Sequence, residues 1–183
     1  MRNKLVCILL AFTGVFTACE NQKGSEKQSA FSDIKIYFDN EINTLKKSDL
    51  SLSKNMFHEG KNEIVTLANP DWSHELIPFT ESISDQQSQI QSYIKDSTID
   101  GTSKVILFTA KDASAIISQL SIYIHEGKQD SIVIIKKVDN SYYSSFDTLS
   151  YYGGGNYKVK AVNIPGFGKK IGFVIEGKTL SKN

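Results

Sequence analysis

The period of the hydrophobic positions changes from helical to strand-like between the two halves of the chain. In the first half, apolar side chains recur every three or four residues, which is typical of amphipathic α-helices. The clearest run consists of Phe31, Ile34, Phe38, Ile42 and Leu45. Two lysines, Lys46 and Lys47, would lie in its last turn, where positive charge is favourable. We therefore expect a helix over residues 31–47.

A second helix is expected to begin near residue 69. Asn69 can cap it, Pro70 suits its first position, and Asp71 complements the helix dipole. The apolar positions that follow at helical spacing are Trp72, Leu76, Phe79 and Ile83. Pro78 should kink or end this helix, because its ring opposes the carbonyl four residues earlier. A further helical turn is expected between residues 84 and 95.

Strand-like alternation dominates from residue 104 onward. Six strands are expected, over residues 104–111, 116–125, 131–138, 142–152, 157–164 and 170–176. Their separators carry glycine, asparagine and aspartate, as tight turns require. Further upstream, the pattern supports only a weak hairpin through residues 59–62 into residues 64–67. The sequence thus predicts an α+β fold, with N-terminal amphipathic helices packed on a C-terminal antiparallel meander sheet of about six strands.

The first nineteen residues follow a third pattern. Arg2 and Lys4 precede an apolar run over residues 5–15. At about 1.5 Å per residue this run makes about 16 Å of helix, about half of a bilayer core. Such a segment is typical of a cleavable export signal, which we assign to residues 1–18.

The stretch Phe16-Thr17-Ala18-Cys19 resembles the lipobox of bacterial lipoproteins, with Phe16 in place of the usual leucine. The resemblance implies an outer-membrane lipoprotein in which Cys19 carries a diacylglycerol and becomes the first mature residue. Glu20, where an aspartate would imply inner-membrane retention, implies the outer membrane; whether the protein faces the periplasm or the exterior stays open. The alternative is an ordinary secretory signal followed by a chance cysteine.

Composition divides the remainder into a tether and one domain. Residues 20–30 contain no apolar side chain larger than alanine, so residues 19–30 are expected to be the lipidated cysteine and a flexible tether. A single domain is expected over residues 31–180. Cys7 lies inside the signal, so its removal excludes a disulfide with Cys19. Loss of Arg2 and Lys4 takes the net charge from +1 to about −1, which provides no electrostatic footprint for nucleic acid.

Candidate catalytic and metal-binding residues do not assemble into a recognisable motif. Each histidine precedes a glutamate, at His58, His74 and His125, but neighbouring side chains point apart on strands and helices. The glycines at residues 153–155 lack the Gly-Lys-Ser/Thr ending of a P-loop and lie between two expected strands. We therefore assign no catalytic, cofactor-binding or metal-binding residue and expect no cofactor.

Tyrosines cluster in the expected hairpin over residues 142–164, where Tyr142, Tyr143, Tyr151, Tyr152 and Tyr157 occur. A four-residue loop at residues 153–156 would pair Tyr152 with Tyr157 and direct both into the core. Tyr151, Lys158 and Lys160 would then share the exposed face. We treat these three residues as a candidate interaction surface, because aromatic residues with a polar tip are enriched at interfaces. Strand propensity alone is the alternative explanation.

These observations favour a membrane-anchored, non-enzymatic binding module that meets an envelope protein or ligand. One alternative is a carrier or sensor of a hydrophobic ligand held between helices and a curved sheet, as in lipoprotein-carrier half-barrels. The other is a hydrolase whose site forms only in three dimensions. A large apolar concavity would favour the carrier. Acidic residues and histidines that converge in a cleft would favour the enzyme, and a flat sheet face would favour the binding module.

Overall fold

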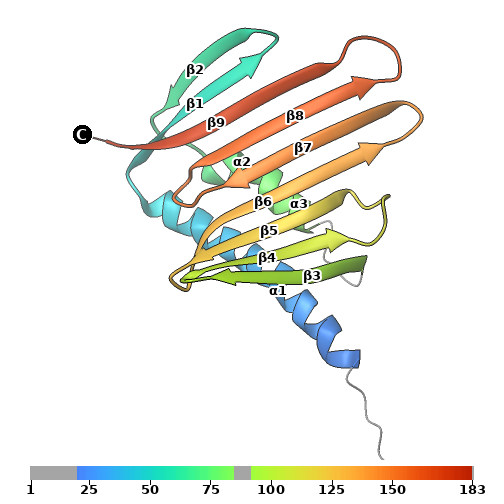
Figure 1. The fold of residues 1–183 in the computed structure, drawn as a ribbon. Helices are drawn as coiled ribbons and strands as arrows, with labels where there is room; N and C mark the ends of the chain where they lie inside the picture. Colours follow the sequence, from blue (N-terminus) through green and yellow to red (C-terminus); the bar gives the residue numbers. More distant parts are fainter. Residues whose placement is uncertain (1–19, 85–91, 183) are drawn as a thin grey trace, which may run out of the picture.

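The computed structural model of the chain describes residues 20–84 and 92–182. Its strands form one antiparallel sheet in the order β2-β1-β9-β8-β7-β6-β5-β4-β3 (Figure 1). The strands are β1 (Leu50–His58), β2 (Lys61–Leu67), β3 (Tyr93–Asp100), β4 (Ser103–Ala110), β5 (Ile117–His125), β6 (Lys128–Asp139), β7 (Tyr143–Tyr151), β8 (Tyr157–Pro165) and β9 (Ile171–Ser181). The helices are α1 (Glu20–Lys47), α2 (Trp72–Glu75) and α3 (Ile77–Ser84).

The expected fold of packed helices on a six-stranded meander is wrong. The sheet has nine strands, because β1, β2 and β3, which precede residue 104, add to the six expected. The hairpin of β1 and β2 corresponds to the weak hairpin expected through residues 59–62 into residues 64–67. Strand β9 pairs with β1 from Leu50↔Ser181 to His58↔Phe173, which brings the N-terminal hairpin into the sheet. The helical content is correspondingly smaller, because α2 and α3 have four and eight residues. Pairing between segments this distant in sequence leaves no local signal.

Helix α1 lies along one face of the sheet and is longer than expected. It begins at Glu20, within the segment expected to be a tether. Phe31 contacts the rings of Tyr93 and Phe108, at centroid distances of 5.4 and 5.5 Å. About two helical turns further along the same face, Phe38 packs edge-on against Tyr151 of β7 at a centroid distance of 5.2 Å. The expected amphipathic face is therefore the face that contacts the sheet. No helix in the part of the chain that the structure describes is long and apolar enough to cross a bilayer.

Helices α2 and α3 begin later than the sequence suggested. Asp71, and not Asn69, is the N-cap, with its carboxylate accepting from the Ser73 and His74 amides at 3.1 and 3.4 Å. Pro78 is the second residue of α3, where a missing N–H costs no intrahelical hydrogen bond. The expected interruption near Pro78 is confirmed as the break between α2 and α3.

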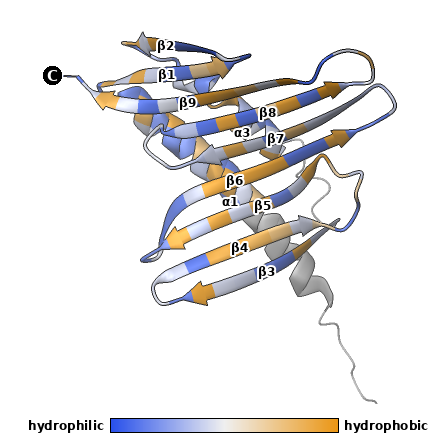
Figure 2. Cartoon of the chain, turned by 45° about the horizontal axis from the view of Figure 1, so that its top comes forward, coloured by the Kyte–Doolittle hydropathy of each residue, from blue (hydrophilic) through white to orange (hydrophobic). Residues whose placement is uncertain are grey.

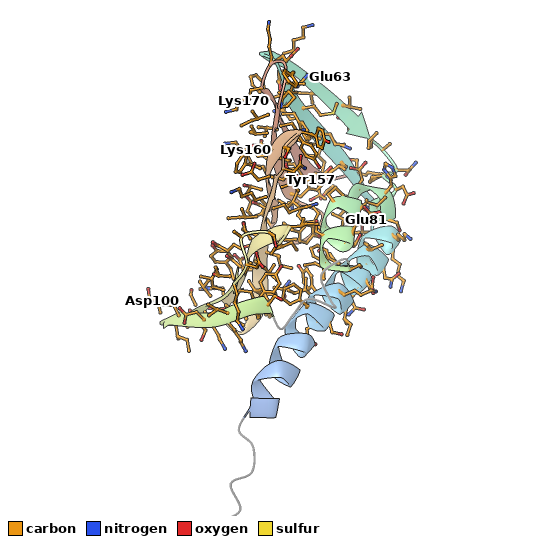
Figure 3. The ribbon with its side chains drawn as sticks, turned by 90° about the vertical axis from the view of Figure 1, so that its right-hand side faces the viewer. Glu63, Glu81, Asp100, Tyr157, Lys160 and Lys170 are labelled. Atoms are coloured by element: carbon orange, nitrogen blue, oxygen red, sulfur yellow. The ribbon has the colours of Figure 1, made fainter. Side chains whose placement is uncertain are left out.

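The helices cover only one face of the sheet, and this face carries the core. Figure 3 views the sheet along its edge: Tyr157 points toward the helices, whereas Lys160 and Lys170 point away from them. Hydrophobic and hydrophilic residues alternate along many of the strands in Figure 2. The hairpin of β1 and β2 leans over the helical side (Figure 3). We call the helical side the inner face and the opposite side the outer face.

Candidate ligand-binding site

An apolar recess of about 370 Å³ opens on the inner face, beside α2 and α3. Its floor consists of apolar side chains from β7, β8 and β9, namely Leu149, Val159, Ala161, Phe173 and Ile175. Polar and charged groups, together with Pro78, surround this floor: Lys54, His74, Glu75, Lys136, Asp147 and Tyr157. The volume falls within the range of about 300–1,000 Å³ that is usual for small-molecule sites.

Strand register explains why the floor is apolar. Leu149 pairs with Val159, which pairs in turn with Ile175, so one row crosses three strands on the inner face. The next row contains Ala161 and Phe173. Residues paired directly across antiparallel strands share a face, so both rows face inward. Neither row is fully covered by the helices, and this leaves the recess.

A buried carboxylate fixes α2 against the sheet at one end of the recess. The Glu75 side chain is only 8% exposed. Its Oε2 accepts a 2.7 Å hydrogen bond from the Tyr157 hydroxyl and lies 2.8 Å from Lys54 Nζ. Burial raises the pKa of Tyr157 above 10, and the hydrogen bond to Glu75 raises it further. Because a buried carboxylate is tolerated only when it is paired and hydrogen-bonded, these two contacts explain why Glu75 can occupy this position.

A similar contact joins α1 to β7. The Tyr151 hydroxyl donates to Glu41 Oε1 at 2.8 Å, and the Gly154 amide donates to the same oxygen at 2.6 Å. The Gly155 amide donates to the Tyr151 hydroxyl at 3.0 Å. Burial raises the pKa of Tyr151, so this hydroxyl stays protonated and available as a donor. Two tyrosines of neighbouring strands thus each bind a helix glutamate and attach α1 and α2 to the inner face of the sheet.

The Tyr157 ring lies over a glycine of the neighbouring strand. Tyr157 pairs with Gly177 in the register of β8 and β9. A Cβ on Gly177 would lie 2.6 Å from Tyr157 Cζ, closer than real side chains approach. The absence of a side chain at Gly177 therefore lets the ring extend across β9 toward Glu75 and Lys54. Phe79 of α3 packs on the same ring at a centroid distance of 6.1 Å.

Lys136 and Asp147 lie on the opposite side of the recess. They are directly paired across β6 and β7, so their side chains share the inner face. The Asp147 carboxylate accepts from the Ser145 hydroxyl at 3.0 Å. Lys54 has an ion-pair partner in Glu75, whereas Lys136 has no ion pair with any described residue. The recess therefore combines an apolar floor with a half-buried cation at its margin.

The expected interaction surface of Tyr151, Lys158 and Lys160 is divided between the two faces. The register of β7 and β8 pairs Tyr151, and not Tyr152, with Tyr157. Tyr151 is consequently buried on the inner face, whereas Tyr152 is 54% exposed, so the expected orientation of β7 is wrong by one residue. The outward orientation of Lys158 and Lys160 is confirmed, and Lys158 forms a 2.7 Å ion pair with Glu176.

The three histidines lie apart from one another. His58 Nδ1 is 3.1 Å from the Gly172 carbonyl oxygen, and His125 Nδ1 is 3.0 Å from the Ser103 hydroxyl. Only His74 lines the recess. Across residues 20–84 and 92–182, no group of three or more histidine, cysteine, aspartate or glutamate side chains could hold a metal ion. Cys19 and the export signal lie outside the described residues.

Sequence reasoning missed most of the recess, although one signal was available. Lys54 interrupts the alternating series Leu50, Leu52, Met56 on the inner face of β1. A charged residue at an inward position requires a partner, and that partner is Glu75, distant in sequence. Trp72 is buried in the core together with Leu76 and Phe79, the apolar residues that follow it at helical spacing.

Comparison with known protein families and with curated protein sequences finds no match to this chain.

Proposed function

We propose that the protein is a lipid-anchored lipoprotein of the bacterial outer membrane that binds the apolar part of a small amphiphile in the inner-face recess. The apolar floor is the main support for the proposed ligand, because it lies at the bottom of a concavity of ligand size. An amphiphile suits it better than a hydrocarbon, because charged groups stand beside the apolar floor. Catalysis is the less favoured function, since the recess offers no nucleophile activated by a neighbouring base.

Recess geometry supports a preformed site. The floor belongs to three hydrogen-bonded strands, and Tyr157 and Glu75 attach α2 to the same sheet. A site built on regular elements loses little conformational entropy when a ligand binds. Lys136, whose ammonium has no ion-pair partner among the described residues, is positioned to receive an acidic head group such as a carboxylate.

Two substitutions at adjacent positions of β8 test the ligand proposal. Ala161 faces the recess, whereas Val162 belongs to the outer face. Ala161→Phe would place a ring in the recess, and Val162→Phe would add the same ring on the outer face. In membranes treated with a photoreactive diazirine fatty acid, Ala161→Phe should reduce labelling of the full-length protein several-fold, whereas Val162→Phe should not. Equal labelling of both variants and wild type would contradict a ligand in the recess.

The anchor is tested separately by Cys19→Ser. The proposed anchor is motivated by the lipobox-like stretch Phe16-Thr17-Ala18-Cys19, which follows an apolar run. Because two acyl chains are needed for firm attachment, the variant should move from the detergent phase to the aqueous phase or accumulate as uncut precursor. Unchanged partition together with unchanged mature size would remove the anchor from the proposal.

A further inference from the structure

Two neighbouring turns at one end of the sheet expose large apolar side chains. Phe167, in the turn between β8 and β9, is 99% exposed, and Tyr142, in the turn between β6 and β7, is 84% exposed. Three further exposed apolar residues flank them, Tyr143, Ile164 and Ile171. Lys169 and Lys170 lie in the same turn as Phe167 and are also exposed. We call these seven residues the turn patch.

Hydrogen bonds hold the two turns in a fixed arrangement. Asn140 Oδ1 accepts from the amides of Tyr142 and Tyr143, at 2.9 and 3.1 Å. The Gly166 amide donates to the Tyr142 carbonyl at 2.7 Å, which joins the two turns. A Cβ at Gly166 would lie 2.9 Å from this carbonyl oxygen, so the contact depends on glycine. The exposed aromatic rings are thus carried by ordered turns and not by an irregular loop.

The turn patch and the N-terminal end of α1 are both on the right-hand side of Figure 1. The two turns are at the upper right, whereas α1 begins at the lower right. Cys19 directly precedes α1 in the sequence. A lipid on Cys19 would therefore bring this side of the molecule toward the bilayer, with the turn patch displaced along the surface from the anchor. Tyr152, in the turn between β7 and β8, belongs to the opposite end of the sheet.

The chemistry of the turn patch suits a lipid surface. Aromatic rings are enriched at the level of lipid head groups, where an apolar body meets a hydrated boundary. Lysines beside them are attracted to anionic lipids and can keep their ammonium groups in the head-group layer. We infer that the turn patch docks on an anionic membrane surface and that Phe167 and Tyr142 insert among the lipid head groups.

Docking would also set the direction from which a ligand enters the recess. Phe173 of the recess floor lies two residues after Ile171 of the turn patch, and Lys136 lies three residues before Asp139 at the end of β6. One margin of the recess, at Phe173 and Lys136, therefore lies toward the end of the sheet that would contact the bilayer, whereas Tyr157, the first residue of β8, lines the opposite margin. The orientation of the molecule on the bilayer rests on the proposed Cys19 anchor. The side chains of the turn patch do not line the recess, so the docking does not depend on ligand binding there.

Tryptophan substitutions in the full-length protein test the docking. Phe167→Trp places a reporter in the turn patch, and Tyr152→Trp places a matched reporter at the opposite end. Trp72, present in both variants, is buried in the core. In vesicles of phosphatidylethanolamine and phosphatidylglycerol with brominated acyl chains, tryptophan emission should be quenched and blue-shifted in the Phe167→Trp variant only. Lys169→Gln combined with Lys170→Gln should reduce this quenching, as should added salt.

Co-flotation with the vesicles reports the anchor, and quenching reports the turn patch. Flotation of both variants with quenching confined to Phe167→Trp supports the docking. Flotation with equal quenching in the two variants overturns the docking but leaves the anchor intact. The turn patch would then be expected to bind a protein partner. Absence of both flotation and quenching overturns the docking and the anchor together.

Discussion

The Tyr157 hydroxyl donates a 2.7 Å hydrogen bond to Glu75 Oε2, and this contact joins the centre of the sheet to α2. Lys54 of β1 completes the group by pairing with the same carboxylate. Three segments that are far apart in sequence therefore meet at one buried charge. This group forms one wall of the recess, so the stability of the helix–sheet contact and the shape of the site are linked.

Replacing the buried carboxylate should destabilise the fold more than removing its tyrosine donor. Glu75→Gln leaves Lys54 without its counter-charge, and we expect a loss of about 2 kcal/mol in the free energy of unfolding. Tyr157→Phe removes one hydrogen bond to a charged group and should cost about 1.5 kcal/mol. Urea unfolding of the single and double variants in detergent measures both values and their coupling.

The exposed ion pair of the outer face supplies the control. Lys158→Ala removes the pair with Glu176 and should leave the unfolding midpoint nearly unchanged, because exposed pairs are screened by solvent. If Lys158→Ala were as destabilising as Glu75→Gln, burial would not explain why the Glu75 ion pair contributes to the free energy of unfolding.

Two glycines of β9 should respond differently to alanine. Gly177→Ala places a methyl group against the Tyr157 ring and should destabilise the protein by about 2 kcal/mol through overpacking. At Gly172 the nearest atom to an added Cβ is the Ala161 carbonyl oxygen at 3.6 Å, an ordinary contact. Gly172→Ala is therefore the matched control and should be close to neutral. Thermal melts of both variants measure the difference, and equal melting temperatures would contradict the close approach at Gly177.

Stability should fall above about pH 10 because buried tyrosines stay protonated in the native state. Burial raises the pKa of Tyr37 to about 12 and also raises those of Tyr151 and Tyr157 above the ordinary value of 10.0. Above pH 10 the unfolded chain has lost these protons while the folded chain retains them, so each further rise in pH favours unfolding. Below pH 10 both states are protonated and this contribution is fully present.

Melting temperatures between pH 8 and pH 12, within about two units of the ordinary tyrosine pKa, measure this effect. Tyr151→Phe should flatten the alkaline decline, because the variant has one fewer group to titrate. Tyr142→Phe, which removes a hydroxyl at an exposed position, is the matched control variant. An unchanged slope in Tyr151→Phe would show that other groups govern alkaline unfolding.

Strands β4 to β9 were predicted because inward and outward residues alternate along them, whereas β3 was missed. Strands β4 to β9 lie within a few residues of the expected ranges, because each has two neighbours and one apolar face. Strand β3 is an edge strand in which only Ile94 and Ile99 follow Tyr93 as apolar residues, so its period was not visible. Edge position removes much of the burial that produces a sequence pattern.

The error in β7 arose from the length of one loop. A four-residue loop would pair Tyr152 with Tyr157, whereas the observed connection pairs Tyr151 with Tyr157. Three consecutive glycines with positive φ, Gly153, Gly154 and Gly155, make the longer connection feasible. Because both candidates are tyrosines, residue type could not distinguish the two registers. The inward orientation of Tyr157 was predicted correctly, since it depends on β8 alone.

Lys136 should matter for an acidic ligand and not for a neutral one. Lys136→Met keeps an apolar stem but removes the ammonium, and we expect about a tenfold loss in capture of a fatty acid, equivalent to about 1.4 kcal/mol. Capture of the corresponding fatty alcohol should change little. Parallel photolabelling with the two probes measures the ratio, and an equal loss for both would mean that Lys136 does not contact the head group.

Mapping the position of the photolabel decides whether a fatty acid occupies the recess. Full-length protein in membranes is labelled with a fatty acid that carries a diazirine near the end of its chain, and the modified residues are identified by peptide mass spectrometry. A fatty acid bound in the recess should modify the recess floor, at Leu149, Val159, Ala161, Phe173 or Ile175. Modification confined to outer-face residues such as Val162 and Val174, with the floor unlabelled, would contradict it.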